Sequence, residues 1–160
     1  HGQVSLRRPA RCQNVEEVNM AGIQENQQAL SSDFSLLTNW EEKYEFLIEM
    51  GLDLPEMDAE KKVDKNLVKG CQSSVWFDIS CQNGTLSFEA DSDSLVVKGL
   101  VAVLDRLFNH QPAKDVLTAD LSIFDELGLW RHISSQRSNG LTAMMAHLKA
   151  AAAECLTEEN

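Results

Sequence analysis

The side chain best suited to chemistry is a cysteine that follows a glycine and precedes a strand-like run. Cys71 stands in the segment Lys69-Gly70-Cys71-Gln72-Ser73-Ser74-Val75-Trp76. Gly70 permits a tight bend and a close approach to another surface, which would present the thiol on a loop. Lys69 would favour the thiolate, the reactive form of cysteine. The pattern suggests sulfur nucleophilicity, although by spacing alone a lone cysteine is more often an inert, small apolar residue.

The remaining cysteines and histidines show no pattern of metal ligands. Cys12, Cys81 and Cys155 form no C-x-x-C pair, and the histidines after residue 100 are widely separated, so we expect no metal site. Cys81 shares a strand face with apolar residues, which favours a core position, and a role as resolving thiol for Cys71 stays open. Cys155 is interpreted as a packing residue. Free thiols are typical of the reducing cytosol, so we expect a cytoplasmic protein.

Charge and hydropathy exclude two classes of function. The 160 residues carry 14 basic and 25 acidic side chains, a net charge of −11, and all of this excess lies after residue 30. Such a chain would repel phosphate, which argues against nucleic-acid binding. No apolar run approaches the ~20 residues that span a bilayer, so we expect a soluble protein without membrane association. An acidic surface suits a solvated domain, or one that docks on a basic partner.

A β-hairpin is the element that follows the cysteine loop. Apolar and polar residues alternate over residues 75–81 and again over 86–90, and the intervening Asn83-Gly84 suits a type I′ turn. Residues 66–69 are a candidate third strand. The expected fold class is α+β, a small antiparallel sheet with its hairpin near residues 75–90 and helices covering its apolar face.

The helices are predicted from spacing and from their end signals. Thr38 to Glu41 has the form of a capping box with Thr38 as N-cap, and Gly51 would end that helix. Further helices are expected over 95–108, from Pro112, around 123–127 and from Ser138 onward. Gly99, inside the helix 95–108, suggests close packing.

The first residues lack this periodicity. We interpret residues 1–30 as an extension, disordered or not native to the protein, with Met20 as a candidate natural start, and expect order to begin near Leu36.

Four motifs in sequence order resemble the SufE/CsdE family of sulfur acceptor proteins. Val68 to Trp76 is similar to the family's cysteine-loop motif, and Trp40 to Tyr44 with Leu52 to Pro55 resembles its first helix and exit. Asp91-Ser92-Asp93 with Val97 to Leu100 resembles the segment after the hairpin, and Arg137 to Leu141 the opening of the last helix. This resemblance implies a single SufE-like domain over residues 34–156.

The resemblance also implies a function. Such proteins act with a cysteine desulfurase as their partner. The pyridoxal phosphate belongs to the desulfurase, so no cofactor is expected in this chain. The matching Cys71 would attack the persulfide of the desulfurase by thiol exchange and carry the sulfur to iron–sulfur cluster assembly or another sulfur pathway. The chain would stimulate the desulfurase and show no turnover without it.

Five further residues are predicted to support the loop or the partner: Gly70, Gln72, Ser73, Asp93 and Arg137. Arg137 would stabilise an anionic sulfur or contact the cysteine loop, or be a surface arginine near a helix start. Asp93 would restrain the loop or cap the next helix.

Two other functions stay open. A regulatory module would bind a desulfurase without accepting sulfur. A cluster-assembly scaffold would need several ligands converging on iron, whereas only Cys71 lies in a suitable loop.

Overall fold

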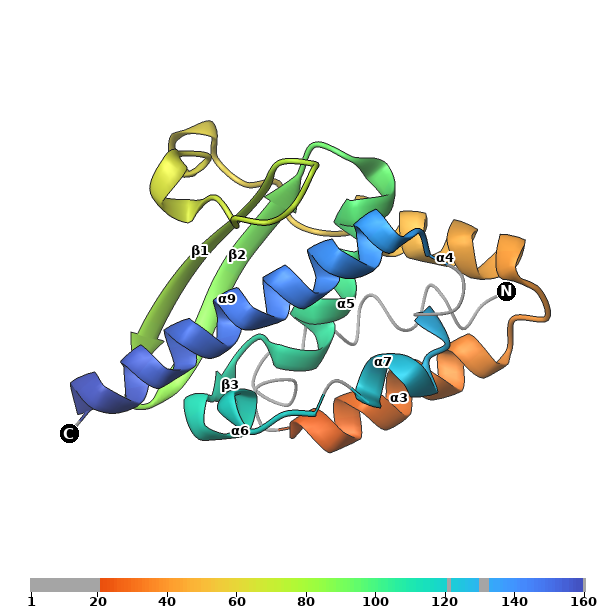
Figure 1. Ribbon diagram of the computed structural model, residues 1–160. Coiled ribbons are helices and arrows are strands. Elements are labelled where there is room, and N and C mark those ends of the chain that lie inside the picture. The colour runs from red at the N-terminus through yellow and green to blue at the C-terminus, as the bar shows by residue number, and fades with distance from the viewer. Residues whose placement is uncertain (1–20, 121, 130–132, 160) are drawn as a thin grey trace.

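The computed structural model describes residues 21–120, 122–129 and 133–159. A three-stranded antiparallel sheet with strand order β1-β2-β3 packs against helices, which confirms the α+β class (Figure 1). In chain order the helices are α3 (Ile23–Ser35), α4 (Trp40–Leu52), α5 (Leu95–Phe108), α6 (Ala113–Leu117), α7 (Ser122–Glu126) and α9 (Ser135–Glu159), with 3-10 turns η1 (Ala59–Lys61) and η2 (Asp64–Asn66). The strands are β1 (Val75–Gln82), β2 (Thr85–Ser92) and β3 (Gln111–Pro112).

The predicted hairpin is confirmed in position and register. Strands β1 and β2 pair from Val75 opposite Ser92 to Gln82 opposite Thr85. The two-residue turn between them has positive φ at both positions, 54° at Asn83 and 77° at Gly84. These values suit a type I′ turn, whose twist matches that of the strands.

The third strand is not the predicted one. Residues 66–69 make a single bridge, Leu67 opposite Trp76, and Asn66 ends the 3-10 turn η2. The short strand β3 instead pairs with the start of β2, where Gln111 lies opposite Leu86. A pairing partner 25 residues away leaves no periodic signal in a two-residue strand, which explains the error.

Helix α5 contributes many buried residues to the core, and its position confirms the helix predicted over residues 95–108. It begins after Ser94, whose hydroxyl accepts a hydrogen bond from the Val97 N–H, and nine of its residues are buried. It crosses α4 at two glycines. A Cβ on Gly51 would lie 2.9 Å from the Gly99 nitrogen, and one on Gly99 would lie 2.8 Å from the Leu47 carbonyl carbon. The two backbones therefore touch, which confirms the close packing expected at Gly99.

Several predicted helix ends are wrong by a turn or less. Asn39, not Thr38, is the N-cap of α4, because its side chain accepts the Glu42 N–H at 2.9 Å. Gly51 lies inside α4, where the crossing with α5 requires a glycine, and does not end it. Helix α9 begins at Ser135, so Ser138 lies in its first turn rather than at its cap.

The chain is ordered well before Leu36. Helix α3 buries Leu30 and Phe34 against the core, and Arg106 of α5 bonds Asp33 at 2.7 Å. The expectation of order beginning near Leu36 is therefore wrong. Two buried apolar residues in a polar helix give too weak a period to recognise. Residues 1–20 lie outside the described part of the chain, so their interpretation as an extension stays a prediction.

A disulfide joins the last helix to the sheet. Cys81 of β1 is bonded to Cys155 of α9, with a Cα–Cα distance of 5.7 Å. The expectation of free thiols is wrong for this pair, and Cys81 is not a resolving thiol for Cys71. The bond lies near the hairpin turn, where Figure 1 shows the end of α9 beside the strand. Cys12 lies outside the described residues.

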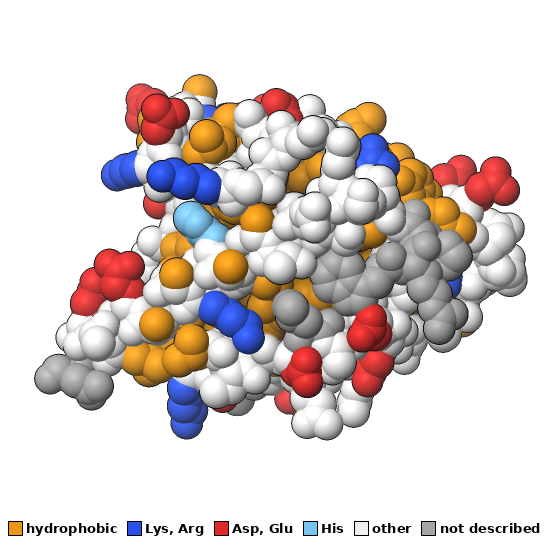
Figure 2. All heavy atoms as spheres, viewed as in Figure 1, with side chains coloured by type: hydrophobic (Ala, Val, Ile, Leu, Met, Phe, Trp, Pro, Cys, Tyr) orange, Lys and Arg blue, Asp and Glu red, His pale blue; other side chains and the backbone are white. Residues whose placement is uncertain are grey.

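Within the described residues, no helix is both long and apolar enough to cross a membrane. In the face shown in Figure 2, acidic side chains gather toward the edges, and much of the centre is uncharged.

Candidate functional site

The loop that carries Cys71 is closed at its base by three hydrogen bonds. The Val68 N–H donates to the Val75 carbonyl at 2.8 Å, and the Asp93 N–H donates to the Ser74 carbonyl at 3.2 Å. The Asp93 carboxylate in turn accepts the Ser74 N–H at 3.1 Å. The ends of a short loop are thus fixed, and Cys71 lies between them.

Gly70 provides the bend before the cysteine. Its φ of 97° lies in the left-handed region that glycine adopts at little cost. A Cβ at this position would lie 3.3 Å from the Cβ of Ala143 in α9. The glycine therefore allows both the turn and the close approach of the loop to α9, as its position in the sequence suggests.

The Cys71 thiol is half-buried against α9. Its Sγ donates a weak hydrogen bond to the Gly140 carbonyl at 3.6 Å, an interaction that a thiolate cannot make. Burial raises the pKa of the Cys71 thiol, because it removes water from the charged form. The expectation that Lys69 favours the thiolate is wrong, since Lys69 is exposed to solvent and burial acts on the thiol unopposed.

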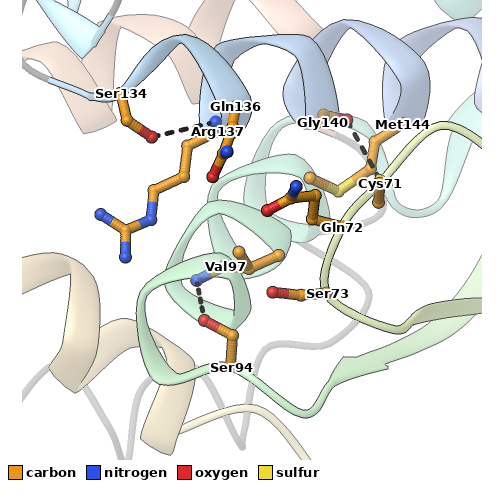
Figure 3. A pocket seen from close by; sticks show the side chains of 10 residues that line it. All are labelled: Cys71, Gln72, Ser73, Ser94, Val97, Ser134, Gln136, Arg137, Gly140 and Met144. Carbon is orange, nitrogen blue, oxygen red and sulfur yellow. Dashed lines mark hydrogen bonds between the residues drawn. The ribbon is translucent and has the colours of Figure 1, made fainter.

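A cavity of 380 Å³ opens beside the thiol (Figure 3). Its walls come from the cysteine loop, the start of α5 and the first turns of α9, with Cys71, Gln72, Ser73, Ser94, Arg137 and Gly140 among the lining residues. The structure thus brings four of the predicted site residues to one cavity: Cys71, Gln72, Ser73 and Arg137. Gly70 and Asp93 shape the loop instead.

Arg137 lies at the end of the cavity away from the thiol (Figure 3). Its backbone N–H donates to the Ser134 hydroxyl at 3.2 Å, and its Nη1 donates to the Tyr44 hydroxyl at 2.6 Å. The guanidinium is therefore directed toward α4 and does not touch the sulfur. Of the roles expected for it, contact with the anionic sulfur is not seen in this state.

A buried carboxylate supports the base of the site. Asp91, 3 % exposed, accepts from Lys62 at 2.9 Å and from Lys98 at 3.3 Å. Burial by itself would raise the pKa of Asp91, but hydrogen bonds from Lys62, from the Ser92 N–H and from Lys98 outweigh it and lower the pKa. This network ties the segment before the cysteine loop to β2 and α5.

Sequence reasoning missed Tyr44, which bonds Arg137, and six residues that line the cavity: Ser94, Val97, Ser134, Gln136, Gly140 and Met144. Tyr44 and Gly140 belong to the motifs at α4 and α9, yet nothing in either motif indicates that one anchors Arg137 and the other accepts from Cys71. Both contacts join segments far apart in the chain. Among the described residues, no three potential metal-ligating side chains gather at one place. His132 lies outside these residues.

Known proteins are similar to this chain in sequence or in fold. A solution structure of a hypothetical protein from Thermus thermophilus matches 82 % of this chain and 96 % of its own, with a TM-score of 0.69 at 19 % identity, which shows the fold alone. A SufE-like protein of Rhizobium meliloti (strain 1021) is 39 % identical over 125 residues, 75 % of this chain and 89 % of the relative. One from Rhizobium etli is 40 % identical over 122 residues, 73 % of this chain and 82 % of the relative.

The family match places these likenesses in one group. The SufE family, described as an Fe-S metabolism associated domain, matches residues 28–152. This range includes the cysteine loop, the hairpin, α5 and the part of α9 that lines the cavity. The general role in this family is sulfur transfer with a cysteine desulfurase. By its relatives and by this match, the chain belongs to the SufE family.

Proposed function

We propose that this chain accepts sulfur as a persulfide on Cys71 from a cysteine desulfurase, stimulates that enzyme and passes the sulfur on. The recipient would be iron–sulfur cluster assembly or another sulfur pathway. The observation that carries the proposal is the position of Cys71, the free cysteine of the described residues, on a closed loop beside a cavity. Membership of the SufE family supports the kind of partner.

The chemistry requires a thiol and no cofactor of the chain's own. The Cys71 thiolate would attack the outer sulfur of the desulfurase persulfide, and the desulfurase thiolate would leave. Pyridoxal phosphate would remain in the desulfurase, where it releases sulfur from cysteine. Each step exchanges one S–S bond for another, so no external oxidant is needed.

The geometry around Cys71 suits the protection of a bound persulfide better than rapid reaction of the free thiol. A raised pKa keeps the Cys71 thiol protonated and therefore slow to react in the resting state. After loading, half-burial beside the cavity would shield the persulfide from oxidants. Loss of the hydrogen bonds between Asp93 and Ser74 would free the loop to move. Gly70 would be the point at which the loop bends.

Steady-state desulfurase assays test this proposal. The wild type should raise the rate of alanine formation from cysteine, and Cys71→Ser should not, because sulfur would remain on the desulfurase. A Cys81→Ser/Cys155→Ser double variant is the control, since it removes the other described cysteines and leaves Cys71. Full stimulation by Cys71→Ser would favour the regulatory module that accepts no sulfur.

A further inference from the structure

The cavity beside Cys71 has two chemically different ends. At one end the thiol lies against α9, near Gly140 and Met144. Arg137 lines the other end, with its guanidinium bonded to Tyr44 of α4, and Figure 3 shows Cys71 and Arg137 on opposite sides of the opening. The volume of 380 Å³ falls within the range of roughly 300 to 1,000 Å³ that small-molecule sites occupy.

Arg137 retains the capacity to bind an anion. None of the ion pairs formed by the described residues involves it, and its hydrogen-bond acceptor is the neutral phenol of Tyr44 at 2.6 Å. A guanidinium has five N–H donors in a planar fork that matches a carboxylate. The phenol thus holds the side chain at the cavity without neutralising its charge.

The two ends of the cavity are both accessible to one small ligand, because Arg137 and Cys71 line the same opening. Arg137, Gly140 and Met144 stand at positions i, i+3 and i+7 of α9, so they share one face of the helix. Arg137 precedes Gly140, which contacts the thiol, by a rise of about 4.5 Å along the helix axis. A ligand with a carboxylate at one end and a sulfur atom at the other can therefore contact Arg137 and Cys71 within this one cavity.

We infer that the cavity binds a small persulfide that carries a carboxylate, such as the persulfide of free cysteine. Arg137 binds the carboxylate, and Cys71 accepts the outer sulfur. This inference rests on the proposed function of Cys71 as a sulfur acceptor and extends it to a donor that is not a protein. Because the chain carries a net charge of −11, a local cation is needed to retain such an anion.

The transfer step is balanced without an oxidant or reductant. Cys71 gives its proton to water, and the thiolate attacks the outer sulfur of the donor R–S–S–H. A new S–S bond forms on Cys71 as the donor's S–S bond breaks. The electron pair leaves on the inner sulfur, which takes up a proton to give R–S–H, while Cys71 holds S–S–H.

Two persulfides that differ only in the carboxylate provide the test. The full chain is mixed with cysteine persulfide or with cysteamine persulfide, without a desulfurase, and sulfur added to Cys71 is followed by intact-protein mass spectrometry. The rate for each persulfide is divided by the rate at which the same persulfide transfers sulfur to N-acetylcysteine, a free thiol, so that differences in intrinsic reactivity cancel. Cysteine persulfide should react about tenfold faster, the value of one hydrogen-bonded charge pair. Equal normalised rates would overturn the inference.

Variants locate the preference. Arg137→Gln should abolish it, whereas Lys69→Gln, which removes an exposed positive charge two residues from Cys71 and outside the cavity lining, should retain it. A preference that survives Arg137→Gln would also overturn the inference. Should Arg137→Gln fail to fold, competition on the wild type decides: S-methylcysteine should slow loading, and S-methylcysteamine should not. Equal effects of the two competitors would refute the carboxylate site.

A parallel desulfurase reaction separates the two claims. Sulfur loading from the desulfurase with no preference between the small persulfides would refute this inference alone. Failure of Cys71 to gain sulfur from either source would refute the proposed function itself.

Discussion

Burial of Cys71 favours the protonated thiol, which is less nucleophilic than the thiolate. The thiol donates to the Gly140 carbonyl and lies half-buried, and burial raises its pKa. A carrier that reacted freely in solution would lose sulfur to other thiols and oxidants. The resting geometry therefore suits a thiol that reacts slowly with reagents in bulk solution.

The pH dependence of alkylation tests this state of Cys71. Only the thiolate reacts with iodoacetamide, and a folded-state pKa above the unfolded one keeps the thiol protonated to higher pH. The rate at Cys71, read by peptide mapping, should reach half its maximum at higher pH in the folded chain than in the same chain in urea. The reverse order would show that the fold favours the thiolate.

Loss of the Asp93 carboxylate should free the cysteine loop. Asp93→Ala removes the acceptor of the Ser74 N–H but keeps the backbone hydrogen bond. Since such a bond contributes about 1 kcal/mol, alkylation of Cys71 should accelerate by about fivefold. Asp115→Ala, at an exposed position of α6, is the matched control and should leave the rate unchanged. An unchanged rate in Asp93→Ala would mean that the carboxylate does not restrain the loop.

Individual site residues were predictable only where their motif was local. Cys71 and Gly70 lie side by side in the chain, and the bend that Gly70 allows is a property of its own backbone. The Tyr44–Arg137 and Cys71–Gly140 contacts join residues 93 and 69 positions apart. Such pairings depend on how α4, α9 and the loop pack, which residue types do not specify.

Elements that have strong hydrophobic periodicity or a clear turn sequence can be predicted from the sequence, whereas elements with a weak periodic signal cannot. The hairpin is specified twice, by alternation on both strands and by Asn83-Gly84 at the turn. Helix α3 has only two buried residues, and β3 has two residues in all. Their existence depends on the surface that α5 and β2 offer them, so a local pattern could not reveal them.

The crossing of α4 and α5 fixes the framework behind the site. Gly99 leaves room for the Leu47 backbone, and the N-cap of the same helix, Ser94, lines the cavity. A change at this crossing should therefore act on the stability of the whole domain.

Gly99→Ala should destabilise the fold although alanine favours helices. The new Cβ would lie 2.8 Å from the Leu47 carbonyl carbon and 3.0 Å from the Leu47 Cβ. Overpacking outweighs the gain in helix propensity, for a net loss of about 2 kcal/mol in the free energy of unfolding by urea. Leu95→Ala, exposed on the same helix, should change it by less than about 0.5 kcal/mol. Equal stability of Gly99→Ala and the wild type would mean that the helices separate easily.

At the scale of the whole molecule, the disulfide and the Cys71 loop lie in different regions. Cys81 and Cys155 join β1 to the end of α9, while Cys71 precedes β1 and contacts α9 near its start. The sequence could not indicate this pairing, because 74 residues separate the two cysteines and only the packing of α9 on the sheet brings them together. Stabilisation and the proposed sulfur transfer would thus use different cysteines.

Removing the disulfide should lower stability without exposing Cys71. Closing a loop of this length restricts the unfolded chain, which the chain-entropy relation values at about 4 kcal/mol. The double variant Cys81→Ser/Cys155→Ser should lose about that much free energy of unfolding in urea, and its Cys71 should alkylate at the wild-type rate. If the double variant and the wild type were equally stable when both are unfolded without reductant, the Cys81–Cys155 disulfide would not be present.

The most direct test of the account is single-turnover transfer of sulfur to Cys71. An active cysteine desulfurase and cysteine are incubated with the chain under non-reducing conditions, and intact-protein mass spectrometry follows both proteins. We predict that one sulfur atom appears on the wild type and on Cys81→Ser/Cys155→Ser, and that none appears on Cys71→Ser. If the wild type gains no sulfur from a matched desulfurase that turns over, Cys71 is not an acceptor.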